Sequence, residues 1–223
     1  IHTVLETFYR TWQEQGHQEV TEEQLDDAAA LLYETAVIEL EEFDAPGTPF
    51  HNRYMSALFD GLGDDPAGPG DPDGPPGLFR RFLEMETNLA ATPARPVALE
   101  GHVGLNSRAS DAPVLSESPV SLPGTTATLH GKIDRLDATP DNELVAYDYK
   151  TGSTPSEDDT LDGYAFQLPV YLLLAESASG SDPVGGSYYQ VNPGESLSVH
   201  SGTIGAKEDA AHRTKRSAKL LRY

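Results

Sequence analysis

Two aspartates and a lysine are the side chains of this sequence best suited to chemistry: Asp134, Asp148 and Lys150. If a hairpin turn is centred on Asp141, residue i faces residue 282 − i, because 282 is twice 141, and Asp134 lies directly opposite Asp148. Lys150 follows Asp148 by two residues and therefore shares its side of the strand. A shift of the turn centre by one residue would put the two aspartates on opposite faces.

Carboxylates that face each other repel, and one of their pKa values rises unless a cation compensates the charge. A hard divalent cation does this well, because oxygen ligands suit Mg²⁺ or Mn²⁺, and the site could hold one or two such ions. A bound ion polarises a phosphodiester oxygen and lowers the pKa of a water molecule. Lys150 could then orient that water or stabilise the charge that grows on the phosphorane. The pattern alone also fits a surface hairpin with scattered charges.

Two strands, at 126–137 and 143–150, must position these residues, and the turn-forming sequence Ala138-Thr139-Pro140-Asp141-Asn142 joins them. One face is expected to carry charge and consists of His130, Lys132, Asp134, Asp148 and Lys150. The other is expected to be largely core and contains Leu129, Ile133, Val145, Tyr147 and Tyr149, with Gly131 and Arg135 among them.

The region before the strands has the pattern of helices. An apolar stripe at helical spacing predicts the first, with members Ile1, Val4, Leu5, Phe8 and Trp12. The sequence Thr21-Glu22-Glu23-Gln24 is a capping box, and we expect it to open a second helix that runs to about Phe43. Further helices are expected at 49–62 and 78–89, with a surface loop rich in Pro and Gly at 63–77.

After residue 93 the pattern changes to that of strands. Inward residues are expected at Val97, Leu99, Val103 and Leu105, alternating with Ala98, Glu100, His102 and Gly104. A loop is expected at 106–124, a helix at 161–177, strands at 186–191 and 196–203, and a helical tail from 206. The tail holds six of the 15 basic residues, so it could line a DNA path or dock further sequence. This order predicts an α/β fold with a mixed sheet flanked by helices.

The chain is strongly acidic, with 36 Asp and Glu against 15 Lys and Arg and a net charge of −21. Such a charge argues against a nucleic-acid partner unless salt screens it. Because acid-rich, lysine-poor surfaces resemble those of salt-loving organisms, we expect a halophilic source. The absence of cysteine excludes disulfides and iron–sulfur clusters within this segment. No apolar run of about 18 residues predicts a membrane span, and the start at Ile1 leads us to expect a fragment of a longer polypeptide.

Three motifs resemble those of one enzyme family. The segment His130-Gly131-Lys132-Ile133-Asp134-Arg135-Leu136-Asp137 resembles its Gly-x-Ile-Asp-Arg-x-Asp strand. The next, Val145-Ala146-Tyr147-Asp148-Tyr149-Lys150-Thr151-Gly152, resembles its hydrophobic-Asp-Tyr-Lys-Thr-Gly strand. The third, Gln167-Leu168-Pro169-Val170-Tyr171, resembles its Gln-Leu-x-x-Tyr helix. Over residues 130–171 the chain thus resembles the RecB/AddB-type branch of the PD-(D/E)XK nucleases.

The resemblance implies a restriction-endonuclease-like core and a role for each matching residue. Asp134 and Asp148 resemble the metal ligands, and Lys150 resembles the catalytic lysine. Gln167 and Tyr171 are four residues apart, share a helix face, and resemble a pair that supports the site or contacts DNA. Helix packing is the alternative explanation for that pair.

Two more residues resemble metal ligands by their position. His2 lies where the family's early Gly…His-hydrophobic pattern ends, although the glycine is not in this chain, and Glu100 lies on the strand before the first motif. The alternatives are a frayed terminal histidine and a solvated glutamate. His102 and His130 have no clear counterpart, so we expect both to be bystanders.

We expect one nuclease domain over 1–223, with a mainly helical part at 1–93, a nuclease core at 94–205 and a basic tail at 206–223. By resemblance, its function is that of a Mg²⁺- or Mn²⁺-dependent DNA exonuclease acting on single-stranded ends in recombination or repair. We expect it in the cytoplasm, in a helicase–nuclease or beside a helicase subunit. A catalytically silent nuclease fold that binds DNA or acts as a scaffold is the alternative, and an acidic interaction protein with a chance motif is a third.

Overall fold

The computed structural model describes residues 1–41, 57–59, 77–89, 94–105, 113–122, 124–150, 152–155, 159, 162–179 and 183–190. These residues form two units, Ile1–Arg95 and Pro96–Gln190. Their boundary lies close to the predicted division between 1–93 and 94–205, while the single domain stays a prediction. Other expectations lie outside the described residues: the helix at 49–62 except 57–59, the loop at 63–77 except its last residue, the strand at 196–203 and the tail from 206.

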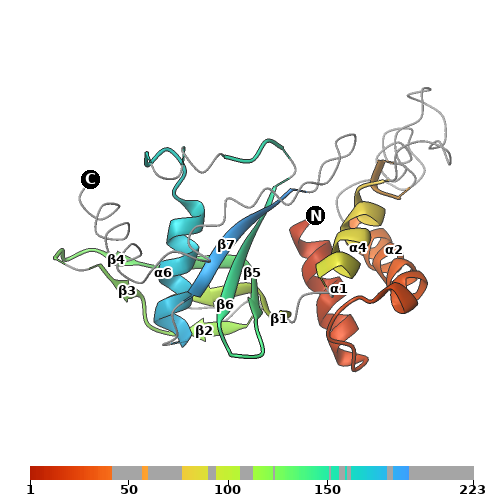
Figure 1. Ribbon diagram of the computed structural model, residues 1–223, viewed down its shortest axis with the longest axis horizontal. Coiled ribbons are helices and arrows are strands. Elements are labelled where there is room, and N and C mark those ends of the chain that lie inside the picture. The colour runs from red at the N-terminus through yellow and green to blue at the C-terminus, as the bar shows by residue number, and fades with distance from the viewer. Residues whose placement is uncertain are drawn as a thin grey trace. The chain divides into compact units, whose positions relative to one another are not determined.

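The first unit contains helices α1 (His2–Glu14), α2 (Leu25–Glu41) and α4 (Leu78–Leu89), with the 3₁₀ helix η1 (Glu22–Gln24) before α2 (Figure 1). The predicted capping box is confirmed, because Thr21 and Gln24 make both of its hydrogen bonds. The apolar residues of α1 are buried, and Phe8 packs edge-on against Phe82 of α4 with ring centroids 6.3 Å apart. Local sequence pattern therefore predicts these three helices correctly, although α2 is described only to Glu41.

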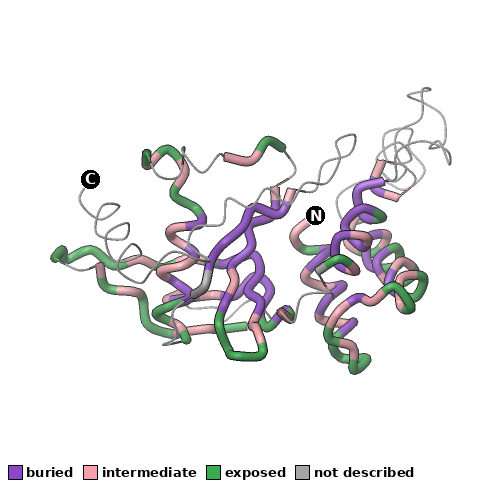
Figure 2. Tube along the Cα trace, in the orientation of Figure 1, coloured by how far each residue is buried: buried purple, intermediate pink, exposed green. Residues whose placement is uncertain are grey.

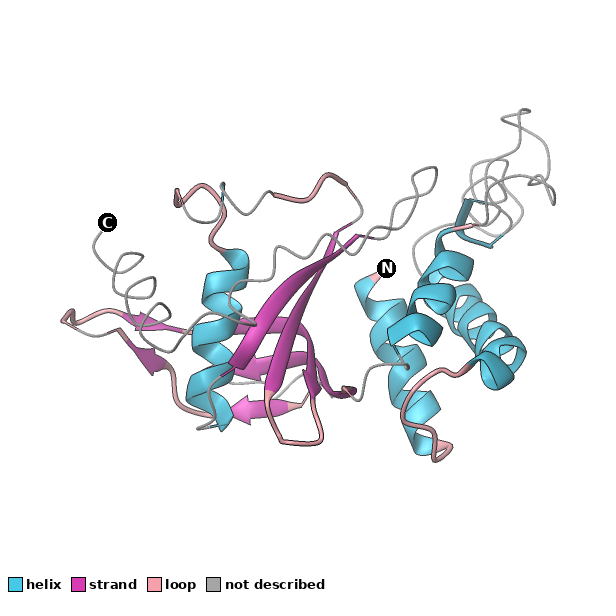
Figure 3. Cartoon of the chain, viewed as in Figure 1, coloured by secondary structure: helices cyan, strands magenta, loops and turns pink. Residues whose placement is uncertain are grey.

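The second unit is built on a β-sheet, whose strands are drawn as magenta arrows in Figure 3. The sheet has five strands in the order β2-β1-β5-β6-β7. The strands are β1 (Arg95–Val103), β2 (Val114–Ser116), β5 (Gly131–Ala138), β6 (Leu144–Lys150) and β7 (Pro183–Gln190). A separate pair is formed by β3 (Val120–Ser121) and β4 (Thr128–Leu129). Because β5 and β6 are antiparallel and β6 and β7 are parallel, the sheet is mixed, which confirms the predicted α/β class.

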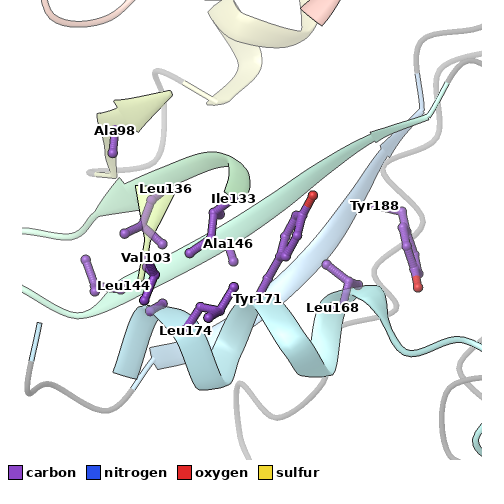
Figure 4. Close-up of a cluster of buried hydrophobic side chains, with 11 residues drawn as sticks. Ala98, Val103, Ile133, Leu136, Leu144, Ala146, Leu168, Tyr171, Leu174 and Tyr188 are labelled. Carbon is purple, nitrogen blue, oxygen red and sulfur yellow. The ribbon is translucent and has the colours of Figure 1, made fainter. Parts of the chain in front are cut away.

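Helix α6 (Gln167–Ser179) connects β6 to β7 and packs against β5, β6 and β7. Figure 4 shows Leu168, Tyr171 and Leu174 of α6 directed at the sheet, where Ile133 and Ala146 meet them. Figure 2 shows the strands of this sheet as largely buried. Gly186 of β7 permits the close approach, since a Cβ there would lie 3.3 Å from Leu168 and 3.4 Å from the carbonyl oxygen of Ala146. This apolar contact holds α6, and hence its polar residues, against the hairpin.

The hairpin between β5 and β6 has the predicted register. Arg135 pairs with Tyr147, Leu136 with Ala146, Asp137 with Val145 and Ala138 with Leu144, so the two residue numbers of each pair sum to 282. In the turn, the amide of Thr139 donates to the carbonyl of Glu143 at 2.9 Å. Asn142 has a φ of 60°, a left-handed conformation that asparagine tolerates better than most residues. The pairing ends at Arg135 and Tyr147, directly next to Asp134 and Asp148, so the opposition of these two aspartates stays a prediction.

The predicted division of the hairpin into a charged and a core face holds only in part. Ile133, Tyr147 and Tyr149 are buried as expected, and Arg135 on the same face is 1% exposed and ion-paired with Asp137. On the face expected to carry charge, however, Leu136 and Ala146 belong to the apolar core. Both faces of the strands are buried, so alternation between apolar and polar residues does not separate core from solvent here.

The predicted alternation in β1 holds only in part. Leu99 and Val103 are buried as expected, whereas Val97 is 54% exposed and Ala98 is buried. Glu100, in the middle of the strand, has a φ of 52°, which breaks the extended backbone on which regular alternation depends.

Three predicted boundaries differ from the structure. The strand expected at 126–137 is interrupted at His130, because its first part pairs in the small sheet and its second in the main one. The loop expected at 106–124 contains β2 and β3. The helix expected from 161 begins at Gln167, because Gly163 has a φ of 81°, which an α-helix does not accommodate. Within the part that the structure describes, no helix combines the length and apolar character needed to cross a bilayer.

Candidate active site

Asp134 lies at the centre of the candidate site and is 5% exposed. Its Oδ1 accepts a hydrogen bond from the Tyr171 hydroxyl of α6 at 2.8 Å. Its Oδ2 accepts a hydrogen bond from the backbone amide of Tyr149 in β6 at 3.1 Å. Because β5 carries the carboxylate and two other elements donate to it, its orientation is fixed from both sides.

A chain of contacts leads from Asp134 to Asp148. Beyond Tyr171, the Gln167 Nε2 donates to the tyrosine hydroxyl at 3.2 Å, which confirms that these two residues share one face of α6. Lys150 Nζ donates to Gln167 Oε1 at 2.6 Å and forms an ion pair with Asp148 Oδ2, also at 2.6 Å. The structure thus brings together the five residues that the sequence predicted as catalytic, in one connected network.

Asp148 is held in an unfavourable environment for a carboxylate. It is 1% exposed, and burial raises its pKa to about 6, with a further upward contribution from the Asp134 carboxylate and an opposing one from Lys150. Its Oδ1 receives no hydrogen bond from the described part of the chain. Since buried polar atoms normally have partners, this oxygen is suited to a ligand that supplies positive charge.

The hydroxyl of Tyr171 is buried beside the same carboxylates. Burial raises the pKa of its hydroxyl, and the charge of Asp134 raises it further. The hydroxyl therefore keeps its proton and remains a donor to Asp134 across the range in which proteins are folded.

Glu100 adds a third buried carboxylate. It is 2% exposed, and one of its oxygens lies within 4.8 Å of an oxygen of Asp134. Lys132, which is half exposed, forms an ion pair with it. A non-glycine residue with positive φ costs about 1–2 kcal/mol, so the bend in β1 that presents Glu100 needs compensation from its surroundings.

The donor set fits a hard divalent cation. Carboxylates outnumber lysines by three to two among Glu100, Asp134, Asp148, Lys132 and Lys150. All the ligand atoms they offer are oxygens, which Mg²⁺ and Mn²⁺ prefer.

The remaining predicted residues are not brought into this network within the second unit. His2 lies in α1, in the first unit, so its assignment as a ligand stays a prediction. His102 is half-buried in β1 and His130 is exposed between β4 and β5, and their status as bystanders also stays a prediction.

Two contacts at the site were not predicted from the sequence. The ring of Tyr188 in β7 has its centroid 5.7 Å from Lys150 Nζ, and Lys132 pairs with Glu100. The position of Lys132 two residues before Asp134, on the same face of the strand, could have indicated its contact with Glu100. The contact between Tyr188 and Lys150 has no signal in the sequence, because it depends on the parallel pairing of β6 with β7.

In a comparison with protein families, a family model described as the PD-(D/E)XK nuclease superfamily matches residues 1–221 of the chain. No curated protein matches it.

Proposed function

Because the chain belongs to the PD-(D/E)XK nuclease superfamily, we propose that it is a Mg²⁺- or Mn²⁺-dependent DNA exonuclease that acts on single-stranded ends. The observation that supports this most directly is the network that joins Asp134, Tyr171, Gln167, Lys150 and Asp148. It contains acidic residues suited to a metal and a lysine at hydrogen-bonding distance from one of them. A catalytically silent fold would not need to keep all of these groups.

In the proposed reaction, the residues of the network have separate tasks. When bound, a divalent ion supplies Lewis acidity and a water of lowered pKa. Asp134 and Asp148 bind the ion, and Tyr171 together with the Tyr149 amide keeps the Asp134 carboxylate in one orientation. Lys150, held by Gln167 and Asp148, places a positive charge where the phosphorane becomes negative. Gln167 and Tyr171 are thus positioning residues.

We propose Glu100 and His2 as further ligands, and titration calorimetry with Mn²⁺ tests both. Glu100 is supported by its distance from Asp134, whereas His2 rests on the sequence resemblance. Glu100→Gln and His2→Ala are each expected to weaken Mn²⁺ binding by roughly 10–100-fold, as losses around metal sites typically do. His130→Ala, which removes an exposed histidine, is the control and should leave the affinity unchanged. Unchanged affinity in either test variant removes that residue from the ligand set.

The activity is tested with end-labelled DNA at high salt. Linear single strands should be shortened with Mg²⁺ or Mn²⁺ and left intact with EDTA, and circular single strands should survive, because an exonuclease needs an end. Cleavage of circles would contradict the exonuclease proposal but not the nuclease. DNA binding without cleavage in the presence of either metal ion would favour the alternative, a catalytically silent module that binds DNA or acts as a scaffold. The net charge of −21 does not decide between the two functions.

We also propose a cytoplasmic role in recombination or repair, with a helicase as partner, in a halophilic cell. The resemblance to RecB/AddB-type domains supports the role, and the acidic composition supports the source. Cell fractionation tests the location, and co-purification from such a cell tests the partner. Recovery in the membrane fraction would contradict the cytoplasmic location, and purification without any helicase would contradict the helicase partner.

A further inference from the structure

Two exposed aromatic side chains lie in the segment that leads into α6, the helix that carries Gln167 and Tyr171 of the network. Tyr164 is 81% exposed and Phe166 is 59% exposed, and Figure 2 shows exposed residues in this segment. Phe166 immediately precedes Gln167, so its Cα lies about 3.8 Å from that of a residue bonded to Lys150.

The backbone that carries the two rings is held by hydrogen bonds. The amides of Tyr164 and Ala165 both donate to the carbonyl of Asp159, at 2.7 and 3.0 Å. A Cβ on Gly163 would lie 3.7 Å from the Phe166 ring, so this ring rests close to the turn. A ring on a fixed backbone loses little conformational entropy when a ligand stacks on it.

The described cationic side chains of this unit are already paired with carboxylates. Among its described residues the cationic side chains are Lys132, Arg135 and Lys150, and each already forms an ion pair with a carboxylate. The chain as a whole carries a charge of −21. The described residues of this unit therefore offer no cation outside an ion pair for a phosphate contact, and salt weakens such contacts further. Stacking on aromatic rings does not depend on net charge.

We propose that Tyr164 and Phe166 form a stacking platform for unpaired nucleobases of single-stranded nucleic acid, beside the candidate active site. The inference rests on the proposed nuclease function and names the part of the substrate that this surface recognises. Paired bases in a duplex do not expose their faces, so the platform selects single strands.

Equilibrium binding in EDTA at high salt tests the platform without hydrolysis. Fluorescence anisotropy compares the whole chain with the double variant Tyr164→Ser/Phe166→Ser, using a labelled single strand and the same strand with consecutive abasic sites. The intact strand is expected to lose about tenfold in affinity per ring, the magnitude typical of base–aromatic stacking. The abasic strand should bind both proteins equally weakly. Tyr164→Phe and Phe166→Tyr, which keep the rings, should restore binding of the intact strand.

The control is Tyr33→Ser, which removes a tyrosine that is 51% exposed in α2 and should leave affinity unchanged. Equal binding of intact and abasic strands by the wild type, an equal loss in the control, or no binding at all overturns the platform. A change of oligomeric state in the double variant, seen by size-exclusion chromatography, would assign the surface to a second copy instead. Base-dependent binding without cleavage would contradict only the proposed enzyme, and cleavage without base-dependent binding would contradict only the platform.

Discussion

The substitution Asp148→Asn is expected to abolish cleavage and at the same time to stabilise the metal-free protein at neutral pH. Cleavage should fall by on the order of 10²–10³-fold or more, because a charge that acts in the transition state is lost. Stability should rise because the wild-type carboxylate is 1% exposed and lies beside Asp134, and an amide there carries no charge to bury. A gain in stability with a loss of activity is the signature of a residue kept for function.

The gain depends on pH in a defined direction. Burial raises the pKa of Asp148 from 3.8 to about 6, so between these values the folded protein holds a proton that the unfolded chain has released. The stability contributed by the protonated group is complete below the lower value and is lost as the pH rises through the upper one. A shift of about two pKa units corresponds to roughly 3 kcal/mol of unfolding free energy. This is the largest stability gain expected for Asp148→Asn, and it is reached above pH 6 or so, where the wild-type carboxylate is ionised in the folded protein.

Denaturant unfolding in EDTA, repeated across this pH range, gives the difference between wild type and variant. Asp141→Asn is the matched control, because Asp141 is exposed in the hairpin turn, and it should change neither stability nor cleavage. An Asp148→Asn protein that is less stable than the wild type at neutral pH would show that Lys150 compensates the carboxylate fully.

The sequence predicted the part of the site that depends on local structure. A five-residue turn between two strands fixed the hairpin register, which the structure shows from Ala138 opposite Leu144 to Arg135 opposite Tyr147. Spacing of four on a helix gave the contact between Gln167 and Tyr171. In both cases the residues that determine the geometry are close in the chain, so their pattern carries the information.

The parts that were missed depend on contacts between distant segments or on a single backbone angle. The parallel pairing that brings Tyr188 to Lys150 joins strands from separate parts of the chain. The left-handed φ of Glu100 interrupts the extended backbone of β1, and glutamate is not a residue from which such a conformation is expected. The burial of both hairpin faces follows from what packs on them, which alternation within one strand does not reveal.

The substitution Asp137→Asn is expected to have the opposite effect to Asp148→Asn, although both remove a buried carboxylate from the same hairpin. Asp137 accepts two hydrogen bonds from Arg135, at 2.6 and 2.8 Å, and the two side chains are only 1–2% exposed. An asparagine removes the negative charge that Asp137 presents to the buried guanidinium, and breaking a buried ion pair in this way typically costs about 3–5 kcal/mol of unfolding free energy. This is a large share of the stability of an ordinary domain.

The double variant Arg135→Met/Asp137→Leu should recover most of that loss, because an apolar pair of similar volume carries no charge to desolvate. Glu84→Gln breaks the exposed pair with Arg80 and, as the control, should cost less than about 1 kcal/mol. Cleavage per folded Asp137→Asn molecule, measured at low temperature, should fall far less than in Asp148→Asn, since the pair lies outside the network at the site. An unfolding free energy of Asp137→Asn within about 1 kcal/mol of the wild type would mean that the buried pair stabilises the fold no more than a surface pair does.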